Sequence, residues 1–161
     1  MLPAEERNIA SALGTAFHSI MQQVDLKHEP TLDALVARAA DAQHVGQHAS
    51  TLLEWVKQTL ASPLAERVRK ARRVWRELPF CVASHGVITE GYLDLLFEEQ
   101  AGLVLVDYKT DQVELGGIEA AVEAHRAQLE AYRQAVSQLT GQAPRETWLY
   151  LVRLGLARHI M

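Results

Sequence analysis

The 161-residue sequence predicts an α/β fold in a single domain, residues 1–161. Two observations carry this prediction. Helical patterns fill residues 1–73, whereas two apolar strand patterns joined by a polar turn begin the sheet region, residues 74–161. Within that region a long helical pattern over residues 118–140 separates the central strands from a last one. A chain of this length can bury a sizeable hydrophobic core.

The composition indicates a soluble globular protein with a net charge of −4, which argues against indiscriminate coating of nucleic acid. No apolar run approaches a membrane span and the N-terminus lacks a signal-peptide pattern, so we expect no membrane association and a cytoplasmic location. Cys81 is the single cysteine, which excludes an internal disulfide framework and an iron–sulfur cluster held by this chain. Neither Gly-Lys-Ser nor Gly-Lys-Thr occurs, so no P-loop ATP site is expected.

Residues 3–24 form the first predicted helix, with apolar residues at three- and four-residue spacing. Gly14 lies inside this helix, where glycine costs up to about 1 kcal/mol, so another element is expected to pack closely against it. His18, one turn later, would face the same neighbour, either as a hydrogen-bonded structural residue or as a ligand. Residues 31–45 and 48–60 predict two further helices.

A fourth helix is predicted to begin at Ser62, as the N-cap, and Pro63, in the first turn. It would contain the densest cationic run of the chain: Arg67, Arg69, Lys70, Arg72, Arg73 and Arg76. These side chains form either an ordinary solvated face or a phosphate-binding surface beside a nucleic-acid channel. The candidates for such a surface are Arg69, Lys70, Arg72 and Arg73.

Residues 74–83 predict a strand that carries Glu77, and Pro79 favours an edge position or a bulge for it. Residues 90–97 and 103–110 follow as two strands, which a four- or five-residue loop joins into an antiparallel hairpin.

The predicted hairpin register brings charged residues together. If Glu98 pairs with Leu103, then Asp94 lies opposite Asp107, with Cβ atoms roughly 4.5–5.5 Å apart, and Lys109 shares their face. A bound cation is the least costly way to keep two such carboxylates ionised. The alternatives are solvated charges or a simple surface ion pair, and a slip of one residue would separate the carboxylates.

A long helix is predicted from residue 118 to residue 139 or 140, ending before Gly141 and Pro144. Its expected inward stripe consists of Ile118, Val122, His125, Leu129, Tyr132, Val136 and Leu139. Gln128 and Tyr132 are one turn apart and could act together on one partner, or the tyrosine hydroxyl simply reaches solvent. Residues 146–154 predict the last strand.

Five features recur in a known order along nearly the whole chain. They are a G-x-x-x-H helix (Gly14, His18), a strand with Glu77 before Pro79 and Phe80, a G-x-x-D strand (Gly91, Asp94), the run Asp107-Tyr108-Lys109-Thr110, and a Q-x-x-x-Y helix (Gln128, Tyr132). Together they resemble the RecB-like branch of the PD-(D/E)XK nucleases. The resemblance is in particular to the C-terminal nuclease domain of AddA-type (UvrD/Rep-like) ATP-dependent helicase-nuclease subunits.

The resemblance implies a restriction-endonuclease-like core, a mixed β-sheet flanked by helices, with an extra N-terminal helical region. It implies that His18, Asp94, Asp107 and the Tyr108 carbonyl bind a divalent metal, Mg²⁺ or its substitute Mn²⁺. Asp94, Asp107 and Lys109 would then be catalytic, with the lysine orienting or activating the attacking water. The expected supporting or DNA-contacting residues are Glu77, Thr110, Gln128 and Tyr132.

The function that the resemblance implies is metal-dependent cleavage of DNA, as an exonuclease on single strands, in double-strand-break repair and recombination. A helicase motor in the parent chain or in a partner subunit would feed the DNA. The lone Cys81 departs from relatives that carry four cysteines for an iron–sulfur cluster, so the cluster-bearing branch is excluded. Two alternatives remain, a catalytically silent DNA-binding or scaffolding module and a free-standing RecB-like exonuclease.

Overall fold

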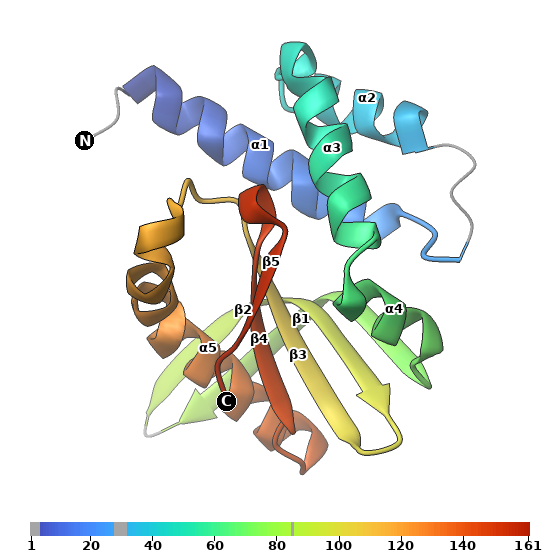
Figure 1. Cartoon of the computed structure of the whole chain (residues 1–161). Helices are drawn as coiled ribbons and strands as arrows, with labels where there is room; N and C mark the ends of the chain where they lie inside the picture. Colours follow the sequence, from blue (N-terminus) through green and yellow to red (C-terminus); the bar gives the residue numbers. More distant parts are fainter. Residues whose placement is uncertain (1–3, 28–31, 85) are drawn as a thin grey trace.

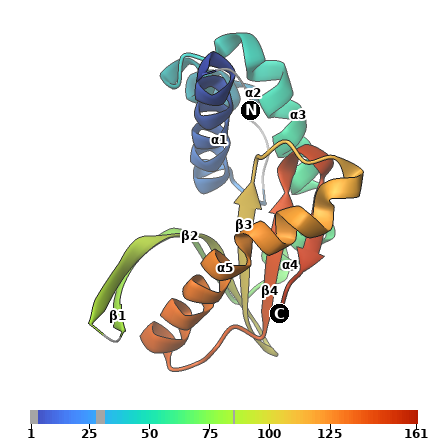
Figure 2. The ribbon, with the colours of Figure 1, turned by 90° about the vertical axis from the view of Figure 1, so that its left-hand side faces the viewer.

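The computed structural model describes residues 4–27, 32–84 and 86–161, and predictions on Pro3 and Thr31 lie outside these residues. A five-stranded mixed sheet forms the centre, in the strand order β1-β2-β3-β4-β5. The N-terminal helices cover one face of the sheet and the long helix α5 covers the other (Figures 1 and 2). This confirms the predicted α/β class. None of the helices in the described part of the chain could cross a membrane.

The N-terminal half contains four α-helices, as predicted. They are α1 (Ala4–Gln23), α2 (Leu32–Ala42), α3 (Ala49–Leu60) and α4 (Pro63–Lys70), with a 3-10 turn, Gly46–His48, before α3. The apolar stripe of α1 buries Leu13, Phe17 and Ile20 against the sheet core. Ser62 caps α4, because its hydroxyl accepts a hydrogen bond from the backbone N–H of Ala65 at 3.2 Å.

The sheet consists of β1 (Arg73–Ser84), β2 (Val87–Glu99), β3 (Gly102–Lys109), β4 (Glu146–Leu151) and β5 (Leu156–His159). The first three strands are antiparallel, β4 runs parallel to β3, and β5 pairs antiparallel with β4. The pairing of Glu98 with Leu103 confirms the predicted hairpin register. The predicted loop length is wrong, however. Both strands continue further than expected, so that only Gln100 and Ala101 separate them.

Strands β1 and β2 extend beyond their pairing with the rest of the sheet and curve away as a two-stranded arm (Figure 2). One face of the arm packs on α5 through Phe80, Leu93 and Val136. Strand β1 is an edge strand, which confirms the prediction drawn from Pro79.

Helix α5 (Ile118–Thr140) is the crossover between β3 and β4, and Gly141 ends it in the left-handed conformation with φ +74°. The predicted inward stripe is wrong at its end, because Leu139 is 54% exposed and the last buried residues of the helix are Ala135 and Val136. The stripe therefore continues in the sequence for one turn beyond the surface that it covers.

Two other sequence predictions are wrong. The helix expected to hold the basic run ends at Lys70, and Arg73 and Arg76 belong to β1. The predicted strand over residues 146–154 ends at Leu151, because a 3-10 turn (Val152–Leu154) and the left-handed Gly155, with φ +59°, reverse the chain into β5. Strand β5 itself had no alternating pattern long enough to predict it.

Candidate metal centre

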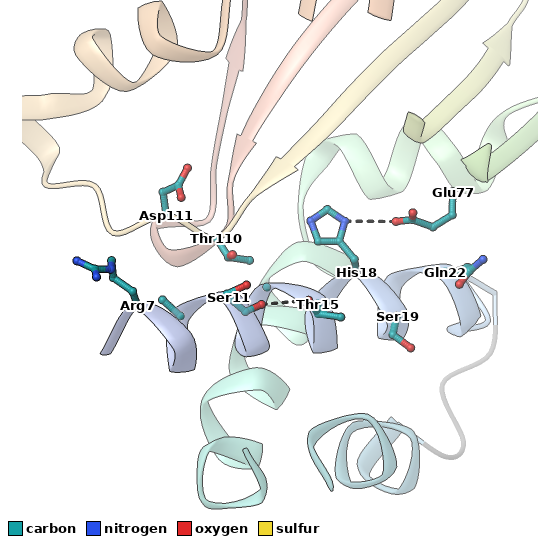
Figure 3. A pocket seen from close by; sticks show the side chains of 11 residues that line it. Arg7, Ser11, Thr15, His18, Ser19, Gln22, Glu77, Thr110 and Asp111 are labelled. Carbon is teal, nitrogen blue, oxygen red and sulfur yellow. Dashed lines mark hydrogen bonds and ion pairs between the residues drawn. The ribbon is translucent and has the colours of Figure 1, made fainter. Parts of the chain in front are cut away.

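Three potential metal ligands converge where α1 crosses the first two strands. His18 Nδ1 lies 3.3 Å from Glu77 Oε1 and 3.3 Å from Asp94 Oδ1. Figure 3 shows the His18 ring and the Glu77 carboxylate pointing toward each other from α1 and β1. The ligand atoms of the three residues all lie within 4.8 Å of one another. Side chains 59 and more residues apart in the chain thus form one cluster.

A local break in the strands aims the Glu77 carboxylate. Glu77 has φ +48°, a left-handed conformation that is costly for a residue with a Cβ. It lies opposite Asp94, between the pairs Arg76–Leu95 and Leu78–Leu93. Strain of this kind persists where the surrounding structure enforces it, which is typical of functional sites.

The same break changes which side chains face α5. In β1 both Trp75 and Leu78 pack toward α5, and in β2 both Leu93 and Leu96 do so, although each pair is three residues apart. Strict alternation would put the members of each pair on opposite faces. The interruption occurs at Glu77 and Asp94 in both strands, so these carboxylates turn toward α1 instead of α5.

Gly14 allows α1 to approach the end of β3. A Cβ on Gly14 would lie 2.9 Å from Thr110 Oγ1, so any other residue would push α1 away from the strand. This confirms the close packing predicted from the glycine. Gly91 has a similar role in the arm, because its Cβ would lie 3.2 Å from the ring of Phe80.

Asp94 and Asp107 occupy neighbouring strands, one step beyond the last pair of the ladder, Leu95 with Val106. Asp94 Oδ2 accepts a hydrogen bond from the backbone N–H of Tyr108 at 2.7 Å. The Asp107 side chain is only 3% exposed, and its Oδ2 forms an ion pair with Lys109 Nζ at 2.9 Å. That oxygen accepts no well-aligned hydrogen bond from the described residues, so the ion pair satisfies it only in part.

The electrostatics of the cluster call for a cation. Burial raises the pKa of Asp107 to about 6, the negative charge of Asp94 adds to this, and Lys109 offsets part of the shift. Burial alone would lower the pKa of His18, but hydrogen bonds and charges from Asp94 and Glu77 outweigh it and raise that pKa to about 10. A proton on His18 therefore balances the carboxylates in the metal-free protein.

The donor set fits a divalent metal. One imidazole nitrogen among carboxylate oxygens suits Mg²⁺ and Mn²⁺, and the Asp107 oxygen without an aligned donor adds a further acceptor beside them. The observed trio differs from the predicted ligand set, because Glu77 joins it while Asp107 turns toward Lys109. Metal ligation by Asp107 and by the Tyr108 carbonyl stays a prediction.

The two polar residues of α5 act as a pair at the border of this cluster. Gln128 Nε2 donates a hydrogen bond to the Tyr132 hydroxyl at 2.9 Å, and the tyrosine ring packs edge-on against Phe80. Partial burial raises the pKa of Tyr132, and the charge of Asp107 raises it further. The hydroxyl therefore lies within the field of the acidic site, although its role there stays a prediction.

The basic run does not form one continuous surface. Arg69 donates hydrogen bonds to the carbonyls of Leu26 and Leu60, at 2.8 and 2.7 Å, so its guanidinium holds two loops together. Lys70 pairs with Glu66 at 2.8 Å on the same helix. Arg72 and Arg73 are exposed, with Arg73 3.6 Å from Glu98. A DNA-binding role for these residues stays a prediction.

Sequence reasoning missed the open groove that leads to the cluster. The groove has a volume of about 710 Å³ and is lined by Arg7, Ser11, Thr15, His18, Ser19, Gln22, Glu77, Thr110 and Asp111, among others (Figure 3). Polar residues at three- and four-residue spacing along α1 were the signal that could have revealed it. Arg153 was also missed, because nothing in its local sequence shows that its Nε donates to the Thr110 carbonyl at 2.6 Å.

Comparison with known proteins gives the family. The sequence profile of the PD-(D/E)XK nuclease superfamily matches residues 2–159. Curated relatives named as ATP-dependent helicase/nuclease subunits include one from Desulforudis audaxviator, 34% identical over 168 residues, which span 92% of this chain and 14% of that protein. Another, from Alkaliphilus oremlandii, is 32% identical over 163 residues, 88% of this chain and 14% of that protein. The chain thus spans about 14% of the length of these two relatives. It belongs to the PD-(D/E)XK nuclease superfamily, as its five motifs predicted.

Proposed function

We propose that this chain is a divalent-metal-dependent DNA nuclease domain that degrades single-stranded DNA as an exonuclease. The observation that carries the proposal is the convergence of His18, Glu77 and Asp94 beside the Asp107–Lys109 ion pair. A phosphodiester nuclease needs this combination of a cation site, a positive charge near the attacked phosphate and a route for water.

Each residue of the site has a chemical task in this proposal. His18, Glu77, Asp94 and Asp107 would hold the cation, Mg²⁺ or Mn²⁺, with the Tyr108 carbonyl as a further ligand. The ion would activate a water molecule and offset the charge that develops on the phosphate. Lys109 stays protonated, because the Asp107 carboxylate outweighs the effect of burial and raises its pKa. It therefore positions the water and the phosphate by hydrogen bonding and by charge. Gln128 and Tyr132 would contact the nucleic-acid backbone at the border of the site.

The context that we propose comes from the relatives, which are named as helicase/nuclease subunits. The domain would act in the cytoplasm, in double-strand-break repair and recombination, on DNA delivered by a helicase motor. That motor would belong to the same parent chain or to a partner subunit.

The test is cleavage of end-labelled single-stranded DNA with Mg²⁺ or Mn²⁺ by the wild type, Asp94→Asn and Lys109→Ala. Each substitution should lower the rate by at least about 100-fold, the usual effect of removing a positioned catalytic group. Lys57→Ala, at an exposed lysine of α3, is the control and should cut like the wild type. Resistance of a circular single strand would support exonuclease action, and substrates labelled at either end would give its polarity.

A folded wild type that neither cuts DNA nor binds Mn²⁺ would contradict the proposal. If that protein bound single-stranded DNA as tightly as its Asp107→Ala variant, a catalytically silent DNA-binding module would be the better description.

A further inference from the structure

The face of α1 that points away from the core carries a row of polar side chains. Its opposite face buries Leu13, Phe17 and Ile20. Since residues three and four apart share a helix face, Arg7, Ser11 and His18 fall on one line, with Thr15 and Gln22 beside it. From Arg7 to Gln22 this row is about 22 Å long, at 1.5 Å per residue.

This row forms one wall of the groove, and the metal cluster lies in the same groove. His18 and Glu77 line it together with Ser11, Thr15 and Thr110. Figure 3 shows the row on α1 below Thr110 and Asp111, with His18 directed to Glu77 further along the helix. A ligand lying in the groove would therefore pass directly over the residues that we propose to hold the metal.

The lining chemistry suits a sugar–phosphate backbone more than nucleobases. Hydroxyl and amide groups of Ser11, Thr15, Ser19 and Gln22 supply hydrogen-bond donors, whereas no aromatic side chain lines the groove among the described residues. The Thr15 hydroxyl donates to the Ser11 carbonyl at 3.1 Å, a bond that a phosphate oxygen can replace because a hydroxyl rotates.

We infer that the α1 groove is the backbone-binding subsite of the nuclease, in which phosphates next to the cleaved one contact Ser11 and Thr15. This inference rests on the proposed function and assigns the path of the strand on one side of the metal site. Because neutral hydroxyls make the contacts, binding through the groove releases few counterions, and its salt dependence is weak.

Adding a charge in the groove tests the inference. Fluorescence anisotropy of a labelled oligothymidylate, in EDTA to prevent cleavage and over a range of KCl concentrations, compares Thr15→Lys with Ser50→Lys. Thr15 is exposed on the row, and Ser50 lines a separate open hollow on α3, so both variants change the net charge equally. One new phosphate contact should tighten binding about fivefold at about 0.1 M salt and steepen the log–log salt slope by about 0.7 for Thr15→Lys alone.

A bulky residue provides the opposite test in cleavage assays. Thr15→Trp should raise KM several-fold with kcat within about twofold of the wild type, because it blocks the strand without touching the metal ligands. Equal affinities and equal salt slopes for Thr15→Lys and Ser50→Lys, or an unchanged KM for Thr15→Trp, would overturn the inference. A wild type without metal-dependent cleavage would instead refute the proposed function, and the binding comparison would still decide the role of the groove.

Discussion

Strand β2 carries carboxylates in two places, and the protein treats them in opposite ways. At the end of the strand, Glu99 lies near Glu146 of β4, and the guanidinium of Arg67 from α4 bridges them. Arg67 donates to both Glu99 oxygens, at 2.8 and 2.9 Å, and to Glu146 at 2.8 Å. In the middle of the strand, Asp94 meets Glu77 with only the His18 imidazole between them.

The pKa values record this difference. Hydrogen bonds from Arg67 lower the pKa of Glu99 and of Glu146. Burial and the charge of Asp94 raise the pKa of Asp107 beside the other cluster. Carboxylates that share a permanent side-chain cation stabilise the fold, whereas carboxylates left with a histidine keep a place for an external cation.

The largest effect is expected when the middle cluster receives its own guanidinium. His18→Arg would bridge Glu77 and Asp94 as Arg67 bridges the other pair, so cleavage should fall by at least about 100-fold. Mn²⁺ should no longer raise the melting temperature, since the side chain occupies the metal position. Ser50→Arg adds the same charge on α3 and should change neither property. A His18→Arg enzyme that still cuts would show that this cluster is not the metal centre.

Metal affinity should depend strongly on pH. His18 has a pKa of about 10 in the metal-free protein, so at neutral pH an ion must displace its proton. Apparent Mn²⁺ affinity should therefore rise about tenfold per unit between about pH 6.5 and about pH 8, because one proton leaves for each ion bound. Isothermal titration in buffers of different ionisation enthalpy measures that proton directly. Affinity that stays flat over this range would contradict the ligand role of His18.

Removing the bridge at the other cluster should cost stability without changing the chemistry. Arg67→Met should lower the free energy of unfolding by about 2 kcal/mol at about pH 7, because it leaves two partly buried carboxylates near each other. Both pKa values are lowered in the folded state, so this contribution is present above their unfolded values, near pH 4.5, and is lost as the pH falls further.

Urea unfolding at several pH values would follow this loss, and wild type and Arg67→Met should converge in acid. Arg73→Met, which removes an exposed contact of 3.6 Å with Glu98, is the matched control and should cost less than about 0.5 kcal/mol. A pH-independent difference would mean that Arg67 acts through packing on the Phe97 ring, 5.7 Å away, instead of through charge.

The smallest effect concerns backbone strain at Glu77. With φ at +48°, glycine fits this position better than any residue with a Cβ, so Glu77→Gly should be about 1 kcal/mol more stable than Glu77→Ala. At Ala83, an exposed position of β1 outside the left-handed region, Ala83→Gly should destabilise instead. Thermal melts in EDTA make both comparisons. Equal stability of the two Glu77 variants would show that the strain is not held in the folded protein.

The sequence by itself determined the α/β class, most helices and strands, and the register of the central hairpin. These depend on local patterns: the period of the apolar residues, the Ser62 cap, and the alternation that places Glu98 opposite Leu103. The reason for Gly14 was also predictable in kind, since a glycine within a helix indicates a close neighbour.

Only the tertiary structure decided how the functional groups are arranged. Glu77 became a member of the cluster because a left-handed residue turned it toward α1, and no local pattern predicts that conformation for a glutamate. Arg69 lies within a basic run, yet carbonyls far from it in the sequence bind its guanidinium. The groove, similarly, exists only because α1 lies against Thr110. Contacts between distant segments depend on how the elements pack, and packing is not encoded in the periodicity of any one of them.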